Sequence, residues 1–262
     1  MRSIKAFIQR RLRRLGYDLH RHIPALSGDA QRTAILRTLR VDLVLDVGAN
    51  AGQFARALRE CGFAGRIVSF EPLQAARRIL LEASAGDPHW TVAERAAVGD
   101  RSGEIDMHVA ANSVSSSALD MLDAHVRGAP DSRYVGVERV PLRRLDELAA
   151  PHVTGTGRIL LKIDTQGFED RVLRGAAGIL PRVSAIQIEL SLVPLYAGQM
   201  LLPDMLQLLH ELGFNPWAIW PAFVDPASGR SLQVEAILVR STGNEAGDRP
   251  QVVRMGELDP RA

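Results

Sequence analysis

The stretch at residues 44–52, Val-Leu-Asp-Val-Gly-Ala-Asn-Ala-Gly, joins an apolar run to an acid and a loop of small residues. Asp46 could accept hydrogen bonds from an ammonium group or a water at the end of a strand, where doubly wound sheets have their ligand crevice. Gly48 and Gly52 leave space for a ligand near the backbone, because a Cβ atom would collide with it. The pattern predicts the first strand and turn of a nucleotide-binding α/β domain, although a turn without a ligand has the same pattern. The G-x-x-x-G spacing disfavours NAD, whose loops read G-x-G-x-x-G.

A second acid, Glu71, closes the apolar run at residues 66–70 and precedes Pro72. An ionised carboxylate here can accept hydrogen bonds from both ribose hydroxyls of an adenosine ligand. Its separation from Gly52 matches the roughly 20 residues expected between a glycine loop and such an acid. A proline also suits the first turn of a helix, which Glu71 would then cap. The residues leave both interpretations open.

Two further acids follow later apolar runs. Residues 158–164 predict a buried strand in which alternation places Lys162 and Asp164 on one face. A buried lysine is costly without a partner, so the two residues could form a structural pair. Asp164 is also a candidate general base, hydroxyl-binding residue or ligand of a divalent metal. Glu189, at the end of the strand predicted over residues 185–190, would face the same crevice as a metal or sugar ligand, or would cap the next segment.

Residues 90–98 predict a third strand, and Gly-Asp at residues 99–100 predicts a turn into a hairpin that returns over residues 104–109. Ala97 and Val98 suit the flat face of an adenine, and they equally suit ordinary core packing. The polar region from residue 112 to about 139 has weak periodicity. We expect it to form a long loop that acts as a lid or substrate wall.

Several of these segments together resemble a known protein family. They lie at residues 45–52, 70–72, 96–100, 145–146, 188–191, 195–196 and, most specifically, 161–169, which read Leu-Lys-Ile-Asp-Thr-Gln-Gly-Phe-Glu. Over residues 41–240 the chain resembles the FkbM family of class I S-adenosylmethionine-dependent methyltransferases. The family commonly has an acid where this chain has Gln166, so no carboxylate role is carried over to that position.

The resemblance implies an α/β, Rossmann-like class I methyltransferase fold with a mostly parallel seven-stranded sheet flanked by helices. It implies S-adenosylmethionine as cofactor, a catalytic role for Asp164 and Glu189, and either of these two acids as a ligand if a divalent metal takes part. Ser116 is the serine of the polar region that the resemblance places near the donor. The residues expected to bind the cofactor are Asp46, Gly48, Asn50, Gly52, Glu71, Pro72, Ala97, Val98, Ser116 and Asp164.

The function expected from this resemblance is O-methylation of a hydroxyl on a sugar, a glycolipid or a natural product. A hydroxyl has a high pKa, so a base such as Asp164 must take its proton during attack. Two alternatives remain. An N-methyltransferase of a small metabolite needs no strong base when its amine is neutral, and a binding module on the same fold would not turn over.

The composition indicates one α/β domain with extensions, because 262 residues that are 46% hydrophobic can bury one substantial core. A single cysteine, Cys61, excludes an intramolecular disulfide and favours a reducing compartment. The histidines show no metal-ligand spacing, and no apolar stretch is long enough to cross a bilayer. Nucleic-acid binding is not expected, since no aromatic-basic motif is present.

The N-terminus differs from the rest of the chain. Residues 1–22 carry seven basic side chains and one acid, with apolar residues at helical spacing, whereas the remainder is net acidic. This basic amphipathic helix could lie on an anionic membrane, dock on a partner, or pack on the domain. We expect a helical extension over residues 1–40, a methyltransferase domain over 41–240 and a polar tail over 241–262. The expected location is cytoplasmic, with membrane contact at the inner face as a further option.

Overall fold

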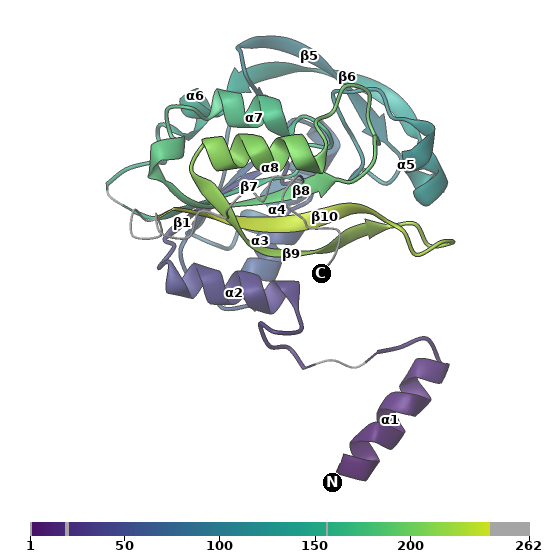
Figure 1. Cartoon of the computed structure of the whole chain (residues 1–262). Helices are drawn as coiled ribbons and strands as arrows, with labels where there is room; N and C mark the ends of the chain where they lie inside the picture. The colour runs from purple at the N-terminus through teal and green to yellow at the C-terminus, as the bar shows by residue number, and fades with distance from the viewer. Residues whose placement is uncertain (1, 19–20, 156, 242–262) are drawn as a thin grey trace, which may run out of the picture.

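The computed structural model describes residues 2–18, 21–155 and 157–241. Its centre is a seven-stranded sheet in the order β3-β2-β1-β7-β8-β10-β9 (Figure 1). These strands are β1 (Leu43–Val47), β2 (Arg66–Phe70), β3 (Trp90–Val92), β7 (Ile159–Ile163), β8 (Val183–Ser191), β9 (Phe214–Val224) and β10 (Ser231–Arg240). Neighbouring strands from β3 to β8 are parallel, and β10 is antiparallel to both β8 and β9. The predicted Rossmann-like class I methyltransferase fold is confirmed.

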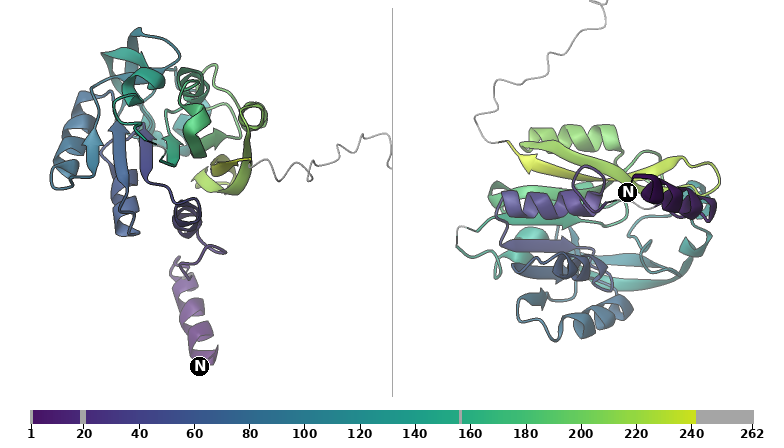
Figure 2. Two further views of the ribbon diagram at one scale, coloured as in Figure 1. Left: turned by 90° about the vertical axis from the view of Figure 1, so that its left-hand side faces the viewer. Right: turned by 90° about the horizontal axis from the view of Figure 1, so that it is seen from below.

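Helices cover both faces of this sheet (Figures 1 and 2). One face carries α2 (Gly28–Thr38), α3 (Gln53–Glu60) and α4 (Gln74–Ser84), and the other carries α6 (Leu145–Ala149), α7 (Glu169–Gly175) and α8 (Leu202–Glu211). Every residue of β1 is buried, and its side chains alternate between the two core layers. Val44 packs on the α2–α4 side, whereas Leu45 packs on the opposite side. This two-sided burial explains why the strand reads as a continuous apolar run.

The order of the strands places a crevice between β1 and β7. From β1 the chain first builds β2 and β3 on one side, and it later returns to β7 on the other side. At such a switch point the loops after the two strands diverge and leave room for a ligand. Asp46 of β1 lies in register with Ser69 of β2 and Lys162 of β7, so three polar residues meet beneath this crevice.

A second, three-stranded sheet lies beside the crevice and corrects one prediction. Its order is β4 (Ala97–Gly99), β6 (Tyr134–Arg144) and β5 (Gly103–Ala110). The predicted strand over residues 90–98 is therefore two strands in two sheets, and the predicted hairpin with residues 104–109 is wrong because β6 lies between its arms. The expected long loop also contains the helix α5 (Asp123–Gly128) and the start of β6. Val135 and Val137 are 68% and 61% exposed, so β6 begins without an apolar pattern.

Helix α2, which precedes residue 41, packs on the sheet. Ile35 and Leu36 of α2 are buried in the core, and Ser27 caps this helix by accepting a hydrogen bond from the amide of Ala30. The basic helix α1 (Arg2–Arg14) lies apart from the domain in Figures 1 and 2. No helix within the described ranges is both long and apolar enough to cross a bilayer. Of the predicted polar tail, only Ser241 is described; residues 242–262 lie outside the described residues.

Two glycines of the loop after β1 are needed by the protein itself. Gly48 and Gly52 have φ angles of +78° and +84°, which L side chains rarely adopt. A Cβ atom at Gly48 would lie 1.8 Å from the carbonyl oxygen of Asp164, and one at Gly52 would lie 2.8 Å from the ring of Trp90. The structure therefore gives a reason for glycine that differs from the predicted one, which was the approach of a ligand.

We predict that Gly48→Ala destabilises the fold by about 3 kcal/mol, because the loops after β1 and β7 must move apart and the backbone must hold a positive φ. Chemical denaturation followed by circular dichroism measures this loss. Gly86→Ala is the control: its Cβ meets nothing within 4 Å, so its effect should stay within about 0.5 kcal/mol. Equal stability of the two variants would contradict the close packing of β1 against β7.

Candidate active site

A cavity of about 420 Å³ occupies the crevice at the carboxyl ends of β1, β2 and β7. It extends from the loop before α3 to the second sheet on one side and to α2, β9 and β10 on the other. The predicted site residues that line it are Gly48, Asn50, Glu71, Pro72, Ala97, Val98, Ser116 and Asp164. Asp46, Gly52 and Glu189 are not among the lining residues. Most of the predicted site therefore converges on one cavity, although these residues come from both sheets.

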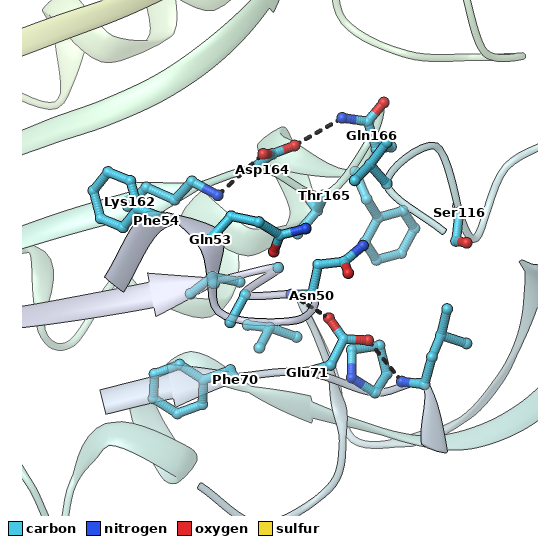
Figure 3. Close-up of a pocket in the computed structure, with 18 of the residues that line it drawn as sticks. Asn50, Gln53, Phe54, Phe70, Glu71, Ser116, Lys162, Asp164, Thr165 and Gln166 are labelled. Atoms are coloured by element: carbon cyan, nitrogen blue, oxygen red, sulfur yellow. Dashed lines mark hydrogen bonds and ion pairs between the residues drawn. The ribbon is translucent and has the colours of Figure 1, made fainter. Parts of the chain in front are cut away.

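Glu71 is held at the floor of this cavity by two backbone amides. Its Oε2 accepts a hydrogen bond from the amide of Asn50 at 2.8 Å, and its Oε1 accepts one from the amide of Leu73 at 2.8 Å (Figure 3). Leu73 is the N-cap residue of α4, so the helix-capping interpretation describes one of these contacts. Each carboxylate oxygen keeps a further lone pair for a ligand hydroxyl. Burial raises the pKa of Glu71 to about 7, against the effect of the two amide hydrogen bonds.

Asn50 links the loop after β1 to the wall formed by the second sheet. Its backbone has a φ of +46°, and its Oδ1 accepts a hydrogen bond from the amide of Ala51 at 2.7 Å. Its Nδ2 donates to Ser113 Oγ at 3.2 Å. Ser116 is engaged within the same wall, because its hydroxyl accepts from the amide of Ala110 and donates to the carbonyl of Ser113. These contacts bring the two loops together over one side of the cavity.

Lys162 lies between two acids beneath the cavity. Its Nζ is 3.0 Å from Asp164 Oδ2 and 3.8 Å from Asp46 Oδ1, and Ser69 donates to the other oxygen of Asp46. Burial alone would lower the pKa of Lys162, but the charges of Asp164 and Asp46 raise it above its usual value. The pKa of Asp46 is raised by burial, while Lys162 acts in the opposite direction. The predicted Lys162–Asp164 pair is present, and Asp164 remains at the cavity wall.

Gln166 connects the two predicted catalytic acids. Its Nε2 donates to Asp164 Oδ1 at 2.7 Å and to Glu189 Oε2 at 3.0 Å, while its Oε1 accepts from the hydroxyl of Tyr196 at 2.8 Å. Gln233 also donates to Glu189 Oε2 at 2.9 Å. Burial is the main cause that raises the pKa of Glu189 well above its usual value. Glu189 therefore contacts the cavity wall only through Gln166, and Asp164 is the one of these two acids that a ligand can touch.

The same arrangement does not suit a divalent metal. An amide nitrogen lies between Asp164 and Glu189 and donates to both, where a shared metal would need acceptor oxygens alone. The second oxygen of Asp164 is already paired with the ammonium group of Lys162. Within the described ranges, no group of three His, Cys, Asp or Glu side chains is arranged to hold a metal ion. The side chains around Asp164 and Glu189 therefore do not fit a divalent metal ion.

Three residues of this network, Tyr196, Gln233 and Glu169, were given no role from the sequence. Tyr196 and Gln233 support Gln166 and Glu189 from segments distant in the chain. Tyr196 lies in the resembling segment at residues 195–196, which gave it no role, and no local pattern marks Gln233. Gln166 carried a signal, namely an amide where the resembled family commonly has an acid. Glu169 is the third: its Oε1 accepts from the amides of Thr165 and Gly167 and so shapes the loop after β7. Burial raises the pKa of Glu169 to about 7.

Comparisons with known proteins found one family and several relatives. The 2-O-methyltransferase NoeI of Sinorhizobium fredii is 28% identical over 210 residues, which cover 77% of this chain and 84% of the relative. Among solved structures, magnesium protoporphyrin IX methyltransferase of Synechocystis with bound S-adenosylmethionine is 10% identical, with 81% of this chain and 78% of that chain covered and a TM-score of 0.44. A TehB-like S-adenosylmethionine-dependent methyltransferase of Corynebacterium glutamicum is 15% identical, with 91% and 97% covered and a TM-score of 0.40. The model of the methyltransferase FkbM domain matches residues 46–216, more than half of the chain, and the chain therefore belongs to the FkbM methyltransferase family.

Proposed function

We propose that this protein is an S-adenosylmethionine-dependent O-methyltransferase that acts on a hydroxyl of a sugar, a glycolipid or a natural product. The observation that carries the proposal is the convergence of Glu71 and Asp164 on one cavity in an FkbM-family chain. The relative NoeI, whose name describes a 2-O-methyltransferase, supports a hydroxyl as acceptor. The protein would act in the cytoplasm, where the donor is made available.

The cavity fits the adenosine part of the donor. Glu71 offers two carboxylate oxygens with free lone pairs, which suit the two ribose hydroxyls. Ala97 and Val98 are 6% and 5% exposed and form an apolar wall, which suits the flat face of an adenine. Gly48 and Asn50 line the floor between Glu71 and Asp164. When bound, the donor supplies an electrophilic methyl group on a sulfonium.

Asp164 is the residue that takes the proton in this proposal. The acceptor oxygen attacks the methyl carbon as the bond from carbon to sulfur breaks, and the hydroxyl proton passes to the carboxylate of Asp164. The products are a methyl ether and S-adenosylhomocysteine. Lys162 and Gln166 each bind one oxygen of Asp164, and these two contacts fix the orientation of the carboxylate. Glu189 holds Gln166 in place and does not itself touch the acceptor.

We predict that Glu71 controls donor affinity and its pH dependence. With a pKa of about 7, Glu71 is mostly protonated at pH 6 and mostly ionised at pH 8, so S-adenosylhomocysteine should bind up to about tenfold more tightly at pH 8. Glu71→Gln should bind weakly at both values and show a flat profile. Isothermal titration calorimetry measures the four affinities, and Glu82→Gln, which neutralises an exposed acid of α4, is the control. Absence of binding by folded wild-type protein would refute the donor site.

We predict that Asp164→Asn lowers kcat for a hydroxyl acceptor by about 10²- to 10⁴-fold, because the amide cannot take the proton. Affinity for S-adenosylhomocysteine should change little. Transfer of a labelled methyl group to a panel of sugars, glycolipids and hydroxylated natural products measures the rate. Glu189→Gln, which alters the acid behind Gln166, should lose less activity. High activity of Asp164→Asn on an amine would instead indicate N-methylation, and binding without transfer would indicate a non-catalytic module.

For α1 we propose contact with an anionic membrane surface. The helix has basic residues and no acid, its last turn contains Arg11, Arg13 and Arg14, and Phe7 is 54% exposed. Clustered arginines complement anionic lipid headgroups, and exposed apolar side chains can enter the interface. Such contact would hold the protein at the surface in which a glycolipid acceptor lies.

We predict that vesicles of phosphatidylcholine with one quarter phosphatidylglycerol sediment the full-length protein, and that vesicles of phosphatidylcholine alone do not. Arg10→Glu combined with Arg14→Glu should reduce binding at least tenfold, since each basic residue near such a surface contributes about 1 kcal/mol. The control makes the same charge change at Arg37 and Arg230, which are exposed on the domain. An equal loss in both double variants would exclude a specific role of α1.

A further inference from the structure

Two buried polar atoms at the α2 end of the cavity have no partner. The side chain of Arg32 comes from α2 and that of Gln187 from β8; the two residues are 6% and 2% exposed, and both line the cavity. Within the described part of the chain, Arg32 Nε donates to no acceptor and Gln187 Oε1 accepts from no donor. A buried polar atom without a partner costs about 1–3 kcal/mol, so two such atoms at one place indicate that a ligand supplies their missing hydrogen-bond partners.

Contacts around Phe54 tie these residues into one cluster. The Arg32 guanidinium lies 5.2 Å from the centre of the Phe54 ring, and Lys162 Nζ lies 5.4 Å from it. Lys162 is in register with Gln187, whose Nε2 donates to Glu235 Oε1 at 2.8 Å. In Figure 3, Lys162 and Phe54 lie at one end of the pocket, away from Glu71 and Ser116. The cluster is therefore separate from the part of the cavity that fits adenosine.

The ion pair of Arg32 does not account for its burial. Arg32 Nη2 is 2.8 Å from Asp29 Oδ1 one helical turn away, but the side chain of Asp29 is 61% exposed. A pair with an exposed carboxylate contributes little to stability, and it leaves other guanidinium donors inside the cavity wall. The guanidinium lies against the Phe54 ring, and Arg32 is buried from water. A second acceptor, supplied from the cavity, would satisfy it.

The cluster offers the two kinds of partner that an α-amino acid needs. A carboxylate only accepts hydrogen bonds and an ammonium group only donates them, so their joint recognition requires a donor beside an acceptor. Arg32 is a charged donor for a carboxylate. Gln187 Oε1 is an acceptor for an ammonium, and the carboxyl group of Glu235 lies next to it in the cavity lining.

We propose that Arg32 binds the α-carboxylate of the methyl donor and that Gln187 accepts a hydrogen bond from its α-ammonium group. The inference rests on the proposed function, since it assigns the amino-acid half of the same donor whose adenosine half lies at Glu71. The donor then spans the cavity from the second sheet to α2. Asp164 lines the cavity wall between these two ends and would then face the reacting part of the donor.

Three ligands distinguish binding of the amino-acid half of the donor from binding of its adenosine half. S-adenosylhomocysteine carries both charged groups, 5′-deoxy-5′-(3-aminopropylthio)adenosine lacks only the carboxylate, and 5′-deoxy-5′-methylthioadenosine lacks both. Calorimetric titration of each into wild-type protein and Arg32→Gln gives a thermodynamic cycle without any measurement of activity. Arg37→Gln, which removes an exposed arginine of the same helix, is the matched control. Thermal unfolding of each variant verifies that it is folded.

We expect Arg32→Gln to lower the affinity for S-adenosylhomocysteine by about 10- to 100-fold, the usual effect of a lost charge-assisted hydrogen bond. The two ligands that lack the carboxylate should bind this variant and wild-type protein within about twofold. Arg32→Lys, which keeps the charge, should recover part of the affinity. Gln187→Met should lower the affinity for the aminopropyl ligand and leave the affinity for the methylthio ligand unchanged.

Two results would overturn the inference. Equal weakening of all three ligands by Arg32→Gln would assign Arg32 a purely structural role, and unchanged affinity for S-adenosylhomocysteine would exclude it from the donor site. Both results are distinct from failure of the proposed function, in which wild-type protein binds none of the three ligands.

Discussion

The buried charge of Lys162 is the constraint on which the site depends. Its ammonium group lies at the junction of β1 and β7, where it pairs with Asp164 and lies near Asp46. Removal of one partner from such a group is strongly destabilising, because it leaves an uncompensated charge away from water. The pairing thus holds the ends of two neighbouring strands in one register. It also keeps Asp164 at the cavity wall, and from there Gln166 extends the network to Glu189.

The cavity has a rigid floor and a wall of more varied structure. The floor consists of the parallel strands, whose backbone hydrogen bonds and two core layers leave little freedom at Asp46, Lys162 and Gln187. The wall consists of the second sheet and the loop around Ser113, which contacts the floor through Asn50. Charged groups at the ends of strands are positioned more accurately than charged groups on loops, because loops hold side chains less well.

Much of the fold and of the site could be predicted because it is encoded locally. The apolar runs that end in Asp46, Glu71 and Asp164 each describe a buried strand with an acid at its end, and the structure has all three there. The partner of β5 could not be predicted in the same way. It depends on β6, in which the apolar residues Val135 and Val137 lie on the exposed face and Glu138 lies on the half-buried face, so the sequence hides the alternation.

Contacts between distant segments were also beyond local reasoning. Gln233 of β10 reaches Glu189 of β8 because these two strands pair. Tyr196, which follows β8, reaches Gln166, which follows β7. The burial of Arg32 was not predicted, because residues 1–40 were expected to form a helical extension. Its burial follows from the packing of α2 on the sheet, which depends on Ile35 and Leu36.

The second sheet forms one wall of the cavity from a single stretch of the chain. Residues 97–144 form one continuous insertion between β3 and β7, and they supply Met107, Val114 and Ala118 to the cavity lining. Substitutions or changes of length in this insertion would reshape one wall while the pairing of β1 with β7 stays intact. The architecture therefore lets the shape of this wall drift within a single contiguous stretch of the gene, while the paired strands of the floor are inherited unchanged.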